Sequence, residues 1–205
     1  TGLGLKFSSI ILDYAGGSLL LTVIYTAVIV WIVGLAVPVT ASYIISVVIC
    51  APAMIQLGIP DFAAHMFVFY YAILSEVSPP TALSPFAAAA LTGGNPYKTT
   101  MYAWKYTLPA FIVPFMFSVD PKGVGILLKG PVVDVIWTTF TALVGIASLA
   151  GGVENWFFKK TTFYERIMLI AGGLALVYPQ PLYDIVGFGL LALVIVLQKL
   201  RKQEI

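Results

Sequence analysis

The chain has 205 residues, of which 60% are hydrophobic and only 10% are charged, and its formal net charge is +2. Because soluble domains average about 25% charged residues, this composition indicates an integral membrane protein. The basic residues form no continuous stripe, which excludes a nucleic-acid partner. A single cysteine and a single histidine exclude an intrachain disulfide and a His/Cys metal cluster. The sequence contains no nucleophile–base pair of the kind found in enzymes, so we do not expect an enzyme. No organic cofactor is expected either.

The first segment, residues 1–17, is mildly amphipathic and predicts an interfacial helix that leads into the membrane. Four further regions are expected at residues 18–57, 58–98, 99–120 and 121–205. The chain begins at Thr1 without a methionine or a signal peptide, so we expect it to be part of a longer polypeptide.

Residues 18–57 contain two apolar arms separated by a short stretch from Gly34 to Thr40. Each arm is slightly shorter than the roughly 20 residues that cross a bilayer core. The pattern fits either two tight spans or a re-entrant helical hairpin with its tip at residues 34–40. We favour the hairpin, because Pro38 has no N–H for the Gly34 carbonyl and a glycine lets the backbone approach an ion closely.

Residues 58–98 predict one transmembrane helix that is broken in the middle. A continuous helix through the apolar part would be about 46 Å long, which exceeds the thickness of the bilayer core. Pro79 and Pro80 lack N–H groups and would leave the carbonyls of Ser75 and Glu76 without helical partners. The break is therefore expected just before the proline pair. In hydrocarbon it persists only where it lines a cavity or binds an ion.

The two ends at this break suit ligands of opposite charge. The first half-helix ends near Ser75 with the negative end of its dipole and the Glu76 carboxylate, which favours a cation. Oxygen ligands favour a hard ion such as sodium. The second half-helix begins at residues 78–80 with free N–H groups, which suit an anionic substrate group. The alternatives are a packing kink without a ligand and, for Glu76, a water-filled cavity, a basic partner or a coupling proton.

Two further candidate residues have two interpretations each. His65 lies on an apolar helix face, where we favour a hydrogen-bonded packing role over contact with the substrate. Thr40 either contacts a ligand at the tip of the hairpin or caps its second arm.

The C-terminal part predicts a transmembrane helix over residues 99–120 and a three-helix membrane extension over residues 121–205. Placing the C-terminus in the cytoplasm brings the strong basic clusters to the cytoplasmic side, as the positive-inside rule requires. These clusters contain Lys98, Lys105, Lys159, Lys160, Lys199, Arg201 and Lys202. We therefore expect a multi-pass protein with a cytoplasmic C-terminus.

Residues 58–83 read GIPDFAAHMFVFYYAILSEVSPPTAL. This stretch resembles the large permease subunit of the tripartite ATP-independent periplasmic (TRAP) transporters and, more closely, the fused permeases of their TAXI branch. The resemblance continues through residues 86–90, through residues 93–96 and into the helix that begins at Met101. Residues 34–44 resemble the tip of the family's outer hairpin. The resemblance as a whole covers about residues 1–120. The last three helices resemble the extension of the fused permeases.

The resemblance implies an all-α, elevator-type secondary transporter of two inverted repeats, in which this chain is the second repeat. It implies a sodium site at Gly34, Ser75, Ser78 and Thr81, where Ser75 stands in place of the family's glycine and Ser78 in place of its threonine. Pro79 and Pro80 match the prolines of the family's helix break.

The same resemblance implies the partners and the location. These are a periplasmic TAXI-type solute-binding protein, the N-terminal half of the permease, a small membrane subunit and the lipid bilayer of a bacterial or archaeal inner membrane. The main hypothesis is therefore sodium-coupled uptake of an organic anion, such as a carboxylate. The alternatives are a proton-coupled carrier that uses Glu76 and a non-transporting membrane scaffold.

Overall fold

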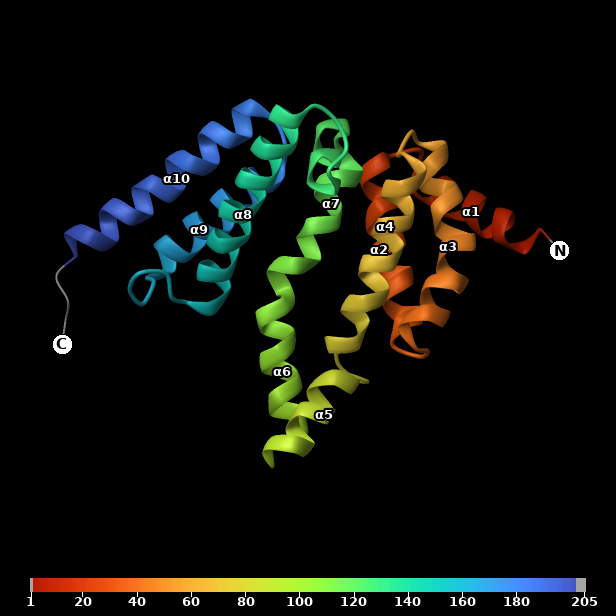
Figure 1. The fold of residues 1–205 in the computed structure, drawn as a ribbon, viewed down its shortest axis with the longest axis horizontal. Helices are drawn as coiled ribbons and strands as arrows, with labels where there is room; N and C mark the ends of the chain where they lie inside the picture. The colour runs from red at the N-terminus through yellow and green to blue at the C-terminus, as the bar shows by residue number, and fades with distance from the viewer. Residues whose placement is uncertain (1, 202–205) are drawn as a thin grey trace. The chain divides into compact units, whose positions relative to one another are not determined.

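The computed structural model describes residues 2–201, and this part of the chain is all-α, with ten α-helices (Figure 1). Three of the described helices are long and apolar enough to cross a membrane: α3 (Val39–Gln56), α8 (Val132–Glu154) and α10 (Pro181–Leu200). The chain divides between Thr107 and Leu108 into two compact units, which are described in turn. The predicted all-α class is confirmed.

The first unit is built around α2 (Leu19–Gly34), α3 and α4 (Asp61–Leu74), which pack against one another. The N-terminal helix α1 (Leu3–Tyr14) packs against α3. The interior of the three helices consists mainly of small and β-branched side chains, which allow close helix packing. Its fully buried members include Val23, Val30, Cys50, Ala53, Met54, Ala63, Ala64, Phe67 and Val68.

The helix break lies where the prolines predict it. Helix α4 ends at Leu74, a 3₁₀ turn covers Ser75–Val77, and Ser78 has extended backbone angles. Helix α5 (Leu83–Thr92) begins five residues later and packs against α6 (Pro96–Thr107). The segment from Asp61 to Thr92 is therefore two half-helices joined by an irregular connection.

The predicted continuous helix over residues 99–120 is interrupted. Helix α6 ends at Thr107, a 3₁₀ segment occupies Leu108–Ile112, and α7 covers only Val113–Val119. Two prolines explain the interruption, because Pro109 and Pro114 have no N–H groups to donate to the preceding turns.

The second unit contains the 3₁₀ segment η3 (Pro121–Leu127) and the helices α8, α9 (Phe163–Val177) and α10. Helix α9 packs against both α8 and α10. Two adjacent glycines of α9, Gly172 and Gly173, allow this double contact. A Cβ added to Gly173 would lie 2.7 Å from the carbonyl oxygen of Gly145 in α8, and one added to Gly187 in α10 would lie 2.9 Å from that of Gly172. Glycine pairs of this kind let helix backbones approach closely.

Candidate functional site

The end of α2 lies directly against the helix break. A Cβ added to Gly34 would lie 2.6 Å from the Cβ of Ser75 and closer still to its hydroxyl oxygen. Real Cβ atoms essentially never come that close, so only glycine fits at this position without movement of Ser75. The structure thus brings together two of the four residues predicted to bind sodium.

A second hydroxyl oxygen lies beside this contact, on Ser42 of α3. Its Oγ would be 3.2 Å from the same added Cβ on Gly34. Ser42 is fully buried, and its Oγ has no hydrogen-bond partner among the described residues. Ser42 was missed in the sequence analysis, although its spacing with the buried Ser46 and Cys50 would place all three on one face of α3.

The hydroxyls at the break are oriented by their own helix. Ser75 Oγ donates to the carbonyl of Ala72 at 2.6 Å, and Ser78 Oγ donates to the carbonyl of Leu74 at 2.8 Å. Both serines are buried. Each hydroxyl hydrogen is therefore used, and the oxygen lone pairs stay available to a cation.

The prediction that the Ser75 carbonyl is left free is wrong. The backbone N–H of Ser78 donates to it at 3.1 Å, which closes the 3₁₀ turn. The tighter i to i+3 bond replaces the helical bond that Pro79 cannot make. The Glu76 carbonyl faces prolines at both of its helical donor positions, Pro79 and Pro80, so helical N–H groups cannot reach it.

The carboxylate of Glu76 is directed toward the second half-helix. Its Oε2 accepts a hydrogen bond from Ser84 Oγ at 3.3 Å, and Ser84 lies in the first turn of α5. The backbone of α5 has no side-chain cap at its start. A carboxylate near a helix N-terminus is stabilised by the free N–H groups there. Glu76 is thus placed where the sequence predicted the anionic group of a substrate.

The other predicted site residues differ in their burial. Thr81 and Pro79 are half-buried and Pro80 is exposed within the connection to α5, and the Pro79–Pro80 peptide is cis. Thr40 is exposed in the first turn of α3. It does not cap that helix, because the cap position is Pro38 and no side-chain cap bond is formed.

His65 makes a hydrogen bond between helices. Its Nδ1 lies 2.8 Å from the hydroxyl of Tyr43 in α3, and the two rings are in contact. The hydrogen bond fits the packing role expected for His65, although its side chain is exposed, and that role stays a prediction. Contact of His65 with a substrate stays a prediction.

The side chains that meet at Gly34 are uncharged. Ser42 and Ser75 supply hydroxyls there, Ser78 adds a buried hydroxyl at the helix break, and the described residues contain no group of three or more His, Cys, Asp or Glu that could hold a metal ion. Hydroxyl and carbonyl oxygens of this kind suit a hard cation of low charge rather than a transition metal.

An all-α membrane protein with a proline-broken helix and buried oxygens at the break has the features of a secondary transporter. Residues 1–122 match the model of the DctM component of the tripartite ATP-independent periplasmic transporters. The chain belongs to this family, and it is part of a TRAP transporter permease. The resemblance to the large TRAP permease subunit is thereby confirmed. No match was found among curated proteins or among solved structures.

Membership in this family establishes the general activity. TRAP permeases are multi-pass membrane proteins that act as ion-coupled secondary transporters, and a periplasmic binding protein delivers their substrate. They are not enzymes. The family therefore speaks against the scaffold interpretation.

Proposed function

We propose that this chain is the second inverted repeat of an elevator-type, TAXI-branch fused permease, and that it binds the coupling ion between α2 and the broken helix. The observation that carries this proposal is the contact between Gly34 and Ser75. It joins the end of one helix to the interruption of another, which is the arrangement by which transporters expose backbone oxygens to an ion.

In this proposal, α2 and α3 form a re-entrant hairpin with its tip at residues 34–40. The 16 residues of α2 are fewer than the roughly 20 that a full span requires. Three hydroxyls on the two helices, at Thr22, Ser42 and Ser46, are buried and have no hydrogen-bond partner among residues 2–201. A polar interior of this kind suits a helix pair that packs inside a protein and near an ion path.

We assign sodium as the coupling ion. Its ligands would be the Gly34 backbone and the hydroxyls of Ser42, Ser75 and Ser78, with Thr81 contributing from the connection after the prolines. Neutral oxygen donors match a monovalent hard cation, and the buried position excludes competing water. The negative end of the α4 dipole points toward the same place.

The position of Glu76 supports a second candidate, proton coupling. Because its carboxylate lies at the start of α5, an anionic substrate approaching those N–H groups would meet a like charge. Protonation of Glu76 would remove that charge and free the helix end for the substrate. Proton and anion would then bind together, which is the requirement for symport.

The cargo in this proposal is an organic anion, such as a carboxylate, delivered by a TAXI-type binding protein. The N-terminal half of the permease supplies the other repeat, and the C-terminus lies in the cytoplasm. The substrate contacts proposed in this chain are the start of α5, Pro79, Pro80, Thr40 and His65.

The test is ion-dependent uptake by the complete transporter in proteoliposomes. Ser75→Ala and Ser78→Ala should each raise the half-saturating sodium concentration at least fivefold at unchanged protein level. Ser46→Ala is the matched control, because Ser46 is equally buried. Unchanged sodium dependence in both site variants would rule out the sodium site.

The proton-coupled alternative is separated from sodium coupling by Glu76→Gln, which keeps the side-chain size and removes the titration. If Glu76 carries the proton, uptake by this variant should become independent of pH. If uptake keeps the pH dependence of the wild type, Glu76 is not the coupling site.

A further inference from the structure

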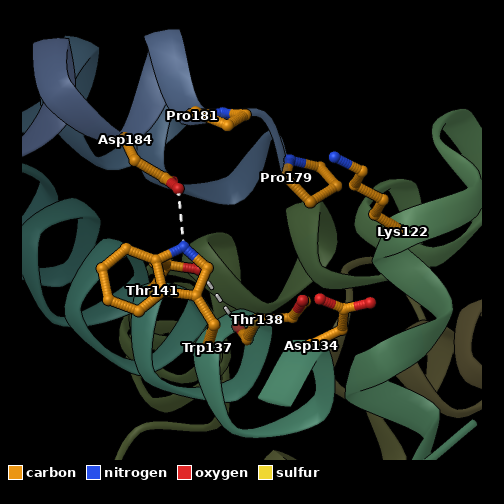
Figure 2. A pocket seen from close by; sticks show the side chains of 8 residues that line it. All are labelled: Lys122, Asp134, Trp137, Thr138, Thr141, Pro179, Pro181 and Asp184. Atoms are coloured by element: carbon orange, nitrogen blue, oxygen red, sulfur yellow. Dashed lines mark hydrogen bonds between the residues drawn. The ribbon is translucent and has the colours of Figure 1, made fainter. Parts of the chain in front are cut away.

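A cavity of about 150 Å³ lies in the second unit, where α8 and α10 both begin (Figure 2). It is lined by Lys122, Asp134, Trp137, Thr138, Thr141 and Asp184, together with the prolines that flank Gln180. The cavity belongs to the three-helix extension and shares no residue with the ion site proposed above.

Asp184 is the unusual residue of this cavity. It is only 5% exposed, and one of its oxygens, Oδ2, accepts a hydrogen bond from Trp137 Nε1 at 2.8 Å. Its other oxygen, Oδ1, is buried and has no hydrogen-bond partner among the described residues. A buried carboxylate oxygen without a partner costs free energy, so the site favours a donor or a cation.

The neighbouring groups define the kind of cation. Thr138 and Thr141 are buried and line the same cavity as Asp184, and the Thr141 hydroxyl donates to the Thr138 carbonyl at 3.2 Å, which leaves its own lone pairs free. Together with Asp184 Oδ1 these oxygens can accept several N–H donors. The Trp137 ring and the two prolines add apolar walls, which suit a carbon attached to the cationic group.

A metal ion fits these residues less well. The described residues contain no cluster of three or more His, Cys, Asp or Glu, and Asp184 already uses one oxygen for Trp137. The charged groups at the other end of the cavity, Lys122 and Asp134, are exposed. Figure 2 shows Lys122 beside Pro179, and no ion pair joins Lys122 to Asp184.

We propose that this cavity binds a primary ammonium group, with Asp184 Oδ1 as its charged acceptor and the threonine oxygens as neutral acceptors. The amine can come from a free alkylamine or from the headgroup of a phosphatidylethanolamine lipid. In the lipid case, the exposed Lys122 is available to the phosphate.

The test is isothermal titration of the complete transporter in detergent with ethylammonium chloride at constant ionic strength. We expect saturable binding that neither sodium nor tetramethylammonium reproduces, because neither offers N–H donors. Asp184→Asn keeps an oxygen for the Trp137 N–H and should weaken binding at least tenfold, which corresponds to about 1.4 kcal/mol. Asp13→Asn, an exposed charge on α1, is the matched control and should bind like the wild type.

Absence of saturable binding to the wild type would overturn the proposal, as would equal binding by Asp184→Asn. Equal competition by sodium would assign the cavity to a metal ion instead and would also overturn it. If Asp184→Asn does not fold, Thr141→Val should still weaken binding, and unchanged affinity in that variant would count against the site. Mass spectrometry of co-purified lipid then identifies the source: retention of phosphatidylethanolamine that is lost in Asp184→Asn indicates the headgroup, and amine binding without such retention indicates a free amine.

Discussion

Gly34 at the end of α2 and Ser75 at the end of α4 are in such close contact that any side chain at position 34 would require Ser75 to move. They are 41 positions apart in the sequence, yet the contact fixes the tip of the α2–α3 pair on the interruption of the next helix. The buried hydroxyls of Ser75 and Ser42 lie at this contact, and the buried Ser78 follows three residues after Ser75. The function proposed for the chain depends on this contact.

The first prediction concerns the fit at Gly34. Gly34→Ala should destabilise the protein by about 1–3 kcal/mol, the usual cost of overpacking, and should strongly reduce uptake. The measurement is the thermal unfolding midpoint in detergent together with transport. Gly34→Ala combined with Ser75→Gly should recover most of the stability, because the second change removes the side chain that the new methyl group meets. Recovery of full ion-dependent transport in the double variant would contradict a role for the Ser75 hydroxyl.

The second prediction separates Ser42 from Ser46 on the same face of α3. Both are buried and have no hydrogen-bond partner in the described part of the chain, but only Ser42 lies beside Gly34. Ser42→Ala should therefore raise the half-saturating sodium concentration for uptake by about fivefold, whereas Ser46→Ala should leave it unchanged. Equal effects of both substitutions would indicate that the hydroxyls serve only helix packing.

The third prediction uses two glycines of α10 that lie two residues apart. A Cβ on Gly187 would lie 2.5 Å from Leu176 Cγ and 2.9 Å from the Gly172 carbonyl oxygen, whereas one on Gly189 would meet open space. Gly187→Ala should lower stability by about 1–3 kcal/mol. Gly189→Ala should raise it by up to about 1 kcal/mol, because alanine is the better helix former. Thermal unfolding of both variants provides the measurement, and equal midpoints would contradict the close packing of α9 and α10.

The fourth prediction concerns the ion pair that joins the end of α10 to the start of α9. Arg201 Nη1 lies 3.1 Å from Glu165 Oε1, and Glu165 also caps α9 through the Thr162 N–H at 2.8 Å. Because Arg201 is about one-third exposed, Arg201→Gln should cost only about 1–2 kcal/mol of stability. Lys199→Gln on the exposed side of the same helix should have no effect on thermal unfolding. Equal loss in the two variants would show that net charge, rather than this pair, matters.

The break in the fourth helix was predictable because proline acts locally. Pro79 and Pro80 remove two N–H groups, and the α-helix ends just ahead of them as that loss requires. The interruption at Leu108–Ile112 follows from the same rule at Pro109 and Pro114, but the apolar composition of this stretch was interpreted as one continuous span. Local backbone chemistry was the better guide there.

The contacts between helices could not be predicted from the sequence in the same way. The spacing of Ser42, Ser46 and Cys50 marks one face of α3, but the sequence does not show that this face meets Gly34 at the end of α2. The hydrogen bond from the Ser78 N–H to the Ser75 carbonyl forms in a 3₁₀ turn, whereas the sequence analysis assumed the wider turn of an α-helix. The hydrogen bond between Glu76 and Ser84 depends on the path of the chain after the proline pair, which the sequence does not show.

The most direct test of the central claim is the thermal stabilisation of the purified protein by sodium, because a ligand that binds only the folded state raises the unfolding midpoint. The wild type should be stabilised by sodium chloride more than by equal concentrations of choline chloride. Ser75→Ala should lose this difference, while Ser46→Ala keeps it. A sodium-specific shift of the same size in Ser75→Ala and in the wild type would contradict an ion site at the contact between Gly34 and Ser75.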